Sequence, residues 1–230
     1  MALQIEILAD AEAAARRAAG WIAGIARDAV AERARCVLAL SGGTTPLPML
    51  RVLATVLDWR QVHVAQVDER VAPPDSPERN VAQLRATLAG HLTAAQLHPM
   101  PVDAADLAAA AAAYGRLLRD LAGVPPQLDL VQLGLGADGH TASLVPGDAA
   151  LDIADADVAV TGPYRGRRRM TLTFPAINRA RHILWLVTGA DKAEVLARLL
   201  QSDPALPASR VRTTSALLLA DRAAASRLHL

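Results

Sequence analysis

The sequence predicts an α/β protein with a largely parallel, Rossmann-like sheet that helices cover on both faces. Short apolar and β-branched runs alternate with longer runs of helical period, which is the pattern of such a sheet. At 230 residues the chain can bury a substantial core in one unit. The Pro-rich stretches at 73–77 and 204–207 are too short to separate domains, so we expect a single domain over residues 1–230.

The expected strands are short apolar runs, most of them followed by a helix signal. They are residues 36–40, 62–67, 128–133, 157–160, 170–173, 182–187 and 217–220. The expected helices are residues 11–33, 46–57, 78–91, 104–122 and 190–201. The alanine tract 108–113 has low complexity, but it lies between Leu107 and Leu117 in a helical period and therefore predicts helix rather than linker.

Composition argues against nucleic acid or a membrane as the partner. The 24 Lys and Arg nearly balance 23 Asp and Glu, and aromatic residues make up only 3%, which leaves little for base stacking. No uncharged apolar stretch reaches 18 residues, and the N-terminus lacks a signal-peptide pattern. We expect a cytoplasmic protein. Cys36, the one cysteine, lies in the run CVLAL and is expected to be a small buried hydrophobe.

The most informative segment is LDLVQLGLGADGHTASLVPG, an apolar strand that leads into a glycine-rich turn. Gly134, Gly136 and Gly139 permit positive φ values and close backbone approach, and we expect N–H groups of this turn to face an anion. The turn presents Asp138 and His140, a carboxylate and an imidazole suited to acid–base chemistry.

The same glycines also spell G-x-G-x-x-G, the spacing of a dinucleotide-binding turn. That fingerprint should open a long helix and place an acid about 20 residues on. Pro146 and Gly147 end any helix within two turns, so we expect no nicotinamide and no other cofactor. The six histidines lack metal-ligand spacing, and we expect no metal. Ser143 has no G-x-S-x-G context, which disfavours covalent serine catalysis.

A second glycine turn, SGGTT, follows the strand CVLAL and precedes Pro46. Its residues are Ser41, Gly42, Gly43, Thr44 and Thr45. A helix that starts at this point presents N–H groups and a positive dipole end suited to phosphate. The spacing and the missing lysine exclude a nucleotide P-loop, so a sugar phosphate suits the turn better; an ordinary capped turn is the alternative.

Polar residues also end two other strands. The segment VDER places Asp68 and Arg70 after one strand, and Lys192 follows the strand HILWLV. Lys192 is the only lysine in the chain, and a compact ammonium serves as a point charge for phosphate. Because carboxyl ends of parallel strands meet at one edge, we expect these residues to converge. Solvated strand ends and chance retention of one lysine are the alternatives.

In order and approximate spacing, five segments resemble the 6-phosphogluconolactonase family over nearly the whole chain. They are SGGTTP, VDERVAP with Asn80 downstream, GLGADGHTASLVPG, RMTLTFPAI and VTGADKAEV. DGHTASL is highly specific, whereas SGGTTP and the later lysine are shared with the related glucosamine-6-phosphate deaminases and ribose-5-phosphate isomerases. The resemblance implies the deaminase/isomerase-like α/β sandwich. It also implies hydrolysis of 6-phosphoglucono-δ-lactone to 6-phosphogluconate in the oxidative pentose phosphate pathway.

For the site, the resemblance implies that His140 is the base that activates water. From the chemistry of the pair, we expect Asp138 to orient or electrostatically support the imidazole. The implied sugar-phosphate residues are Ser41, Gly42, Gly43, Thr44, Thr45, Asp68, Arg70, Asn80, Arg169 and Lys192. The cluster Arg165, Arg167, Arg168 and Arg169 could supply one guanidinium. The sequence departs from the family at Val145, where Phe is usual, and at Arg222, where an acid commonly follows the aspartate matching Asp221. Neither departure removes a proposed catalytic group.

The expected partner is thus a small sugar-phosphate lactone bound by a monomer or weak homo-oligomer. Two rival functions stay open. An isomerase or deaminase would reuse the phosphate loop with Asp68 as the proton-abstracting base. A sugar-phosphate sensor would normally add a DNA-binding segment, and the sequence shows no such extension or basic patch.

Overall fold

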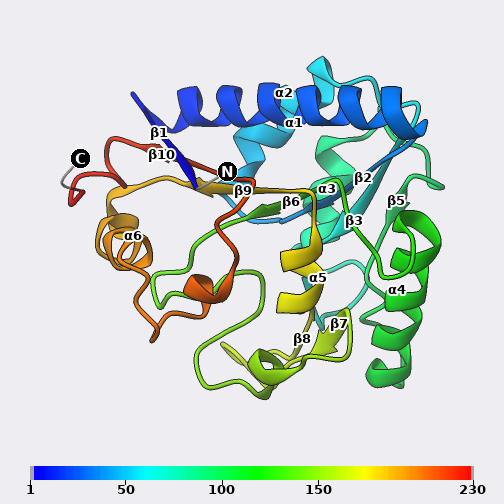
Figure 1. Cartoon of the computed structure of the whole chain (residues 1–230). Coiled ribbons are helices and arrows are strands. Elements are labelled where there is room, and N and C mark those ends of the chain that lie inside the picture. Colours follow the sequence, from blue (N-terminus) through cyan, green and yellow to red (C-terminus); the bar gives the residue numbers. More distant parts are fainter. Residues whose placement is uncertain (1–2, 229–230) are drawn as a thin grey trace.

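The computed structural model describes residues 3–228, and a seven-stranded parallel sheet forms its centre (Figure 1). The strand order is β1-β10-β9-β6-β2-β3-β5. The strands are β1 (Gln4–Leu8), β2 (Cys36–Leu40), β3 (Val62–Gln66), β5 (Leu97–His98), β6 (Leu130–Leu133), β9 (His182–Val187) and β10 (Ala216–Asp221). Every neighbouring pair is parallel, so all seven carboxyl ends lie at one edge.

Helices cover both faces of this sheet. One layer is α1 (Ala11–Arg33), α2 (Pro46–Val56) and α3 (Asn80–Thr87), and the other is α4 (Leu107–Ala122), α5 (Phe174–Arg179) and α6 (Ala193–Leu200). Figure 1 shows α1 and α2 above the sheet and α4, α5 and α6 below it. Strand residues alternate between the two cores: Leu38 packs with the first layer, and Val37 and Ala39 pack with the second. The predicted fold class is therefore confirmed.

A second, three-stranded sheet is antiparallel, and its strands β7 (Val158–Val160) and β8 (Arg169–Leu172) lie below α5 in Figure 1. The sheet has the order β4-β8-β7, with β4 (Asp68–Arg70) paired to β8. The sequence prediction put two of these strands in the parallel sheet, which is wrong, because the hairpin β7–β8 pairs instead with the residues that follow β3. In this pairing Arg70 lies directly opposite Arg169, so two distant cations become neighbours.

The sequence located the strong elements accurately and missed the weak ones. Strands 36–40 and 182–187 and helix 11–33 have the predicted bounds, and the alanine tract is helical in α4. The missed elements are short or at an edge: β1, β4, β5 and the six-residue α5. The predicted helix 78–91 shrinks to α3 because the buried Glu69 carboxylate accepts the amides of Asn80 and Val81, which fixes where the helix begins.

Further corrections concern the short helical turns. The predicted helix 190–201 is divided into a 3₁₀ turn, Ala190–Lys192, and α6. Two more 3₁₀ turns are Ala149–Asp152 and Pro207–Arg210. Cys36 is fully buried as expected, and burial raises the pKa of its thiol. Among the helices of residues 3–228, none has the length and apolar character needed to cross a bilayer.

Candidate active site

A pocket of about 400 Å³ opens at the carboxyl edge of the parallel sheet. Loops that follow β2, β6 and β9 form it together with the start of the antiparallel sheet. The sequence-predicted residues that line it are Ser41, Gly42, Gly43, Thr44, Thr45, Asp68, Arg70, Asn80, His140, Arg169 and Lys192. Asp138 is the one predicted residue that does not line the pocket. It lies directly behind His140 and contacts it.

The SGGTT turn leads into α2 and gives the pocket one wall. Ser41 is anchored by Gln132: its amide donates to Oε1 at 3.1 Å, and its hydroxyl donates to the backbone oxygen at 2.9 Å. Pro46 occupies the first turn of α2, which has no acidic residue there and no side-chain cap, whereas Asp10 caps α1 and Asp106 caps α4. An uncapped helix N-terminus facing a pocket is suited to an anion.

Position 42 must be glycine because the Asn80 side chain leaves no room for a Cβ. A Cβ at Gly42 would lie 2.5 Å from Asn80 Oδ1, which no ordinary contact allows. Asn80 Nδ2 in turn donates to the backbone oxygen of Asp68 at 2.9 Å and to its carboxylate at 3.2 Å. Asn80 thus holds the SGGTT turn, the start of α3 and the start of β4 together at the pocket wall.

Asp68 is a buried carboxylate below the arginines. Ser143 Oγ donates to Asp68 Oδ2 at 2.5 Å, and Arg169 Nη1 approaches the same Ser143 oxygen at 3.4 Å. Burial raises the pKa of Asp68, and the Ser143 hydrogen bond and the charge of Arg169 partly offset this. Ser143 therefore serves as a buried hydrogen-bond link between Asp68 and Arg169.

His140 and Asp138 form a hydrogen-bonded pair although they are only two residues apart. The distance from His140 Nδ1 to Asp138 Oδ1 is 2.5 Å, and the His140 amide also approaches that oxygen at 3.3 Å. Burial raises the pKa of Asp138, but the hydrogen bonds from His140 and Tyr164 outweigh this effect, so the pKa of Asp138 is lowered overall. With Nδ1 engaged, Nε2 is the ring nitrogen available to a molecule in the pocket.

The glycines of this turn act differently from the expectation. Only Gly139 has a positive φ, of +84°, and the amides of Gly136 and Gly139 donate within the turn, to the backbone oxygens of His140 (2.8 Å) and Gly136 (2.9 Å). The prediction that these two amides face an anion is therefore wrong. Gly136 is needed for space, since a Cβ there would lie 2.0 Å from His140 Nδ1.

Three predicted cationic side chains line the pocket, and each has different hydrogen-bond partners. Arg70 Nη1 donates to the backbone oxygen of Glu78 at 2.5 Å. Lys192 Nζ lies 3.0 Å from Asp191 Oδ2, at the start of α6, with 21% of its side chain exposed. Arg169 is buried, and within residues 3–228 its Nε has no hydrogen-bond partner. Burial lowers the pKa of Arg169, and the charge of Asp68 opposes this.

The arginine cluster at 165–169 divides between site and surface. Arg165 and Arg169 line the pocket. Arg167 pairs with Glu78 at 2.6 Å, and Arg168 approaches the backbone oxygen of Thr161 at 3.4 Å. Two guanidinium groups of the run thus belong to the site, where the sequence suggested one.

Sequence reasoning missed Gln132 and Tyr164. Gln132 lines the pocket and is fully buried; its Nε2 has no partner among the described residues. The signal for it was a glutamine inside the apolar strand LVQL. Tyr164 Oη donates to Asp138 Oδ2 at 2.9 Å. The two residues are 26 positions apart, and no local sequence motif predicts their contact.

The positions that depart from the family pattern lie outside the pocket lining. Val145 is buried in the turn that follows Leu144, and Arg222 is exposed with its amide bonded to Leu8. The neighbouring Asp221 accepts the Gly189 amide at 3.1 Å and thereby holds the loop that carries Lys192.

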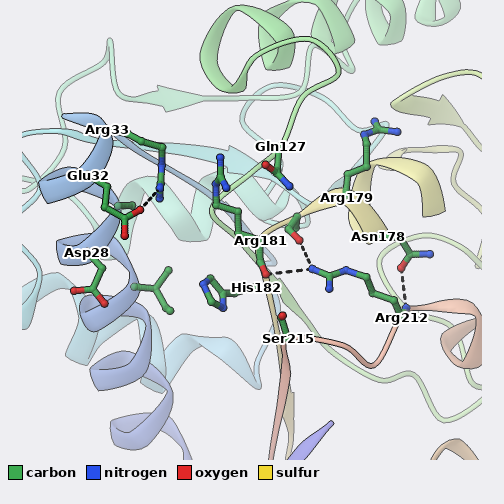
Figure 2. Close-up of a pocket in the computed structure, with 13 residues that line it drawn as sticks. Asp28, Glu32, Arg33, Gln127, Asn178, Arg179, Arg181, His182, Arg212 and Ser215 are labelled. Atoms are coloured by element: carbon green, nitrogen blue, oxygen red, sulfur yellow. Dashed lines mark hydrogen bonds and ion pairs between the residues drawn. The ribbon is translucent and has the colours of Figure 1, made fainter. Parts of the chain in front are cut away.

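A larger cavity, of about 680 Å³, lies at the opposite, amino edge of the sheet (Figure 2). Its arginines have structural partners: Arg33 binds the buried Asp129 at 2.9 Å, Arg179 binds Asp157, and Arg212 donates to the backbone oxygens of Ala180 and Arg181. These guanidinium groups neutralise buried carboxylates and donate hydrogen bonds to backbone oxygens. The residues suited to acid–base chemistry and phosphate binding lie at the carboxyl edge of the sheet, and we place the site there.

Comparison with known proteins assigns the class. A model of the family "Glucosamine-6-phosphate isomerases/6-phosphogluconolactonase" matches residues 9–219, and the chain therefore belongs to this family. The resemblance inferred from the motifs is confirmed.

Within residues 3–228, no group of three or more His, Cys, Asp and Glu side chains is arranged to hold a metal ion.

Similar proteins within the family are named more narrowly. A 6-phosphogluconolactonase from Synechocystis is 38% identical over 213 residues, which cover 89% of this chain and 88% of its own. The solved structure of 6-phosphogluconolactonase from Trypanosoma brucei has a TM-score of 0.89 at 27% identity, covering 98% of both chains. A monomeric glucosamine-6-phosphate deaminase shares the fold, with a TM-score of 0.83 at 23% identity over 98% of this chain and 100% of its own.

Proposed function

We propose that this protein is a carboxylic-ester hydrolase that converts 6-phospho-D-glucono-1,5-lactone to 6-phospho-D-gluconate in the oxidative pentose phosphate pathway. The observation that carries the proposal is the His140–Asp138 pair at a pocket lined by arginine and lysine. The name 6-phosphogluconolactonase, shared by relatives that align over most of the chain, supports the same substrate. The protein acts as a single-domain monomer or weak homo-oligomer in the cytoplasm, without nucleic acid.

His140 is the general base in this proposal. Asp138 accepts the Nδ1 proton, which fixes the neutral tautomer with Nε2 unprotonated and open to the pocket. A water oxygen bonds to the lactone carbonyl carbon while its proton passes to Nε2. The tetrahedral intermediate then collapses, the bond between that carbon and the ring oxygen breaks, and the ring oxygen takes a proton back to become the C5 hydroxyl.

Negative charge develops on the former carbonyl oxygen and must meet donors. The amides of Gly136 and Gly139 are already used inside the turn, so we assign this role to a guanidinium. Arg70 and Arg169 lie opposite each other on β4 and β8 and both line the pocket.

The phosphate group binds at the start of α2 and near Lys192. The uncapped N-terminus of α2 supplies a positive dipole end, and Lys192 supplies a compact ammonium. Phosphate binding at this wall holds the lactone ring near His140, across the same pocket.

The test compares two substrates with one enzyme preparation. We expect hydrolysis of 6-phosphogluconolactone well above its measured spontaneous rate and no ammonia release from glucosamine 6-phosphate. Ammonia release at a comparable rate, with lactone opening only at the spontaneous rate, would favour the deaminase reaction and make Asp68 the candidate base.

A further inference from the structure

Tyr164, one of two tyrosines in the chain, sits at the tip of the β7–β8 hairpin beside the catalytic turn. Its backbone is held by a pair of hydrogen bonds with Arg167, at 2.9 and 3.2 Å, and Arg165 between them has a φ of +51°. The antiparallel pairing of Val160 with Met170 anchors the hairpin below this tip. The tyrosine therefore approaches His140 from a different element than the one that carries the imidazole.

The Tyr164 hydroxyl completes the hydrogen bonding of Asp138. Tyr164 Oη donates to Asp138 Oδ2 at 2.9 Å, while His140 Nδ1 lies 2.5 Å from Oδ1. Each carboxylate oxygen thus has its own partner. The Asp138 side chain is 36% exposed, so the hydroxyl restricts a group that packing alone would leave able to rotate.

The aromatic ring of Tyr164 makes further contacts in the site. Its centroid lies 5.4 Å from that of the His140 ring at an interplanar angle of 63°, an edge-to-face arrangement. The guanidinium carbons of Arg165 and Arg169 lie 5.3 and 5.0 Å from the same ring centroid. Cations at this distance are attracted by the ring face. Tyr164 thus connects the histidine–aspartate pair with two pocket arginines.

We propose that Tyr164 is a positioning residue for the hydrolytic reaction: its hydroxyl fixes Asp138, and through it the tautomer and orientation of His140, and its ring holds Arg169 in the pocket. The inference rests on the proposed function of His140 as base. Burial and the hydrogen bond to Asp138 raise the pKa of Tyr164, so the hydroxyl remains a donor at neutral pH.

Two substitutions separate the hydroxyl from the ring. Tyr164→Phe keeps the ring contacts and removes only the donor to Asp138. Because Asp138 then holds His140 less firmly in the transition state, we expect kcat to fall about tenfold, with KM changed less than about twofold. Tyr164→Leu also removes the platform for Arg165 and Arg169, so its kcat/KM should be lower than that of Tyr164→Phe. Thermal melting of both variants checks the fold.

A spectroscopic readout tests the hydrogen bond without turnover. In ¹⁵N-histidine-labelled protein, His140 should show a downfield, exchange-protected Nδ1–H resonance, assigned by its loss in His140→Ala. We expect this resonance to broaden or disappear in Tyr164→Phe. Wild-type kcat together with an unchanged resonance in a folded Tyr164→Phe protein would overturn the inference and leave the role of His140 intact. Full activity of His140→Ala would instead overturn the base assignment.

Discussion

Gly136→Ala offers the sharpest test of the site geometry, because it adds a single methyl group beside the proposed base. The added Cβ would lie 2.0 Å from His140 Nδ1 and 2.1 Å from Cε1, whereas ordinary contact begins near 3.4 Å. The imidazole must therefore retreat by about 1.4 Å. That shift is large enough to break the 2.5 Å contact with Asp138 and to move Nε2 away from the attacking water.

The expected loss follows from this displacement. A misplacement of about 1 Å in a reacting group can cost about 10²-fold in rate, and complete loss of a general base costs up to about 10⁴-fold. We expect kcat to fall between these values, which is about 3–5 kcal/mol in the barrier. The global fold should persist, since the methyl group meets only the partly exposed side chain of His140 and not the core.

Initial rates of lactone opening, corrected for the spontaneous reaction, measure this effect, and thermal melting verifies the fold. Gly134→Ala is the matched control in the same turn, because a Cβ there has no atom within 4 Å, and its loss should be far smaller. A folded Gly136→Ala enzyme with kcat within about threefold of wild type would refute the steric reasoning.

Three further predictions follow from the same site. His140→Ala should lower kcat by about 10²–10⁴-fold with an unchanged melting temperature, and near-normal kcat in folded protein would contradict the base assignment. Lys192→Ala should raise KM about tenfold or more with a smaller change in kcat, since a charged hydrogen bond contributes about 1.5–3 kcal/mol in ground and transition states alike, and Lys192→Arg should rescue only partly. Equal weakening of a dephosphorylated lactone would argue against phosphate binding. Saturating EDTA should leave the rate unchanged; loss restored by added metal would disprove a metal-independent reaction.

Much of the fold and the lining of the site could be predicted because the signals are local. A run such as CVLAL is too apolar and too short for anything but a buried strand, and Pro46 after SGGTT marks a helix start. Lys192 follows β9 and His140 follows the neighbouring β6, so the parallel pairing of these strands brings both residues to one edge of the sheet. Convergence at this edge needed no knowledge of side-chain contacts.

The remainder depended on tertiary contacts that no spacing encodes. The role of Glu69 in starting α3 requires that the chain fold back over 11 positions, and the Tyr164 contact requires a hairpin whose pairing with β4 was not foreseen. Gly136 stands out in the sequence, but the predicted conformational reason for a glycine there is wrong. The sequence suggests freedom of φ, whereas the structure shows that the imidazole occupies the space of its missing Cβ.

The placement of Arg70 opposite Arg169 explains how the site is prepared for an anionic substrate. Like charges directly opposite each other on paired strands destabilise a sheet. Within the protein, Asp68 offsets part of this repulsion: burial lowers the pKa of Arg169 most, the charge of Asp68 raises it, and the charge of Arg70 lowers it further. Because Asp68 is buried and already bonded to Ser143 and Asn80, it compensates for only part of two guanidinium charges. A negatively charged group that enters the pocket would compensate the remaining positive charge. In the proposed reaction the developing oxyanion would be such a group: the turn amides of Gly136 and Gly139 are already bonded within the turn, and the oxyanion would reach full charge only during the reaction.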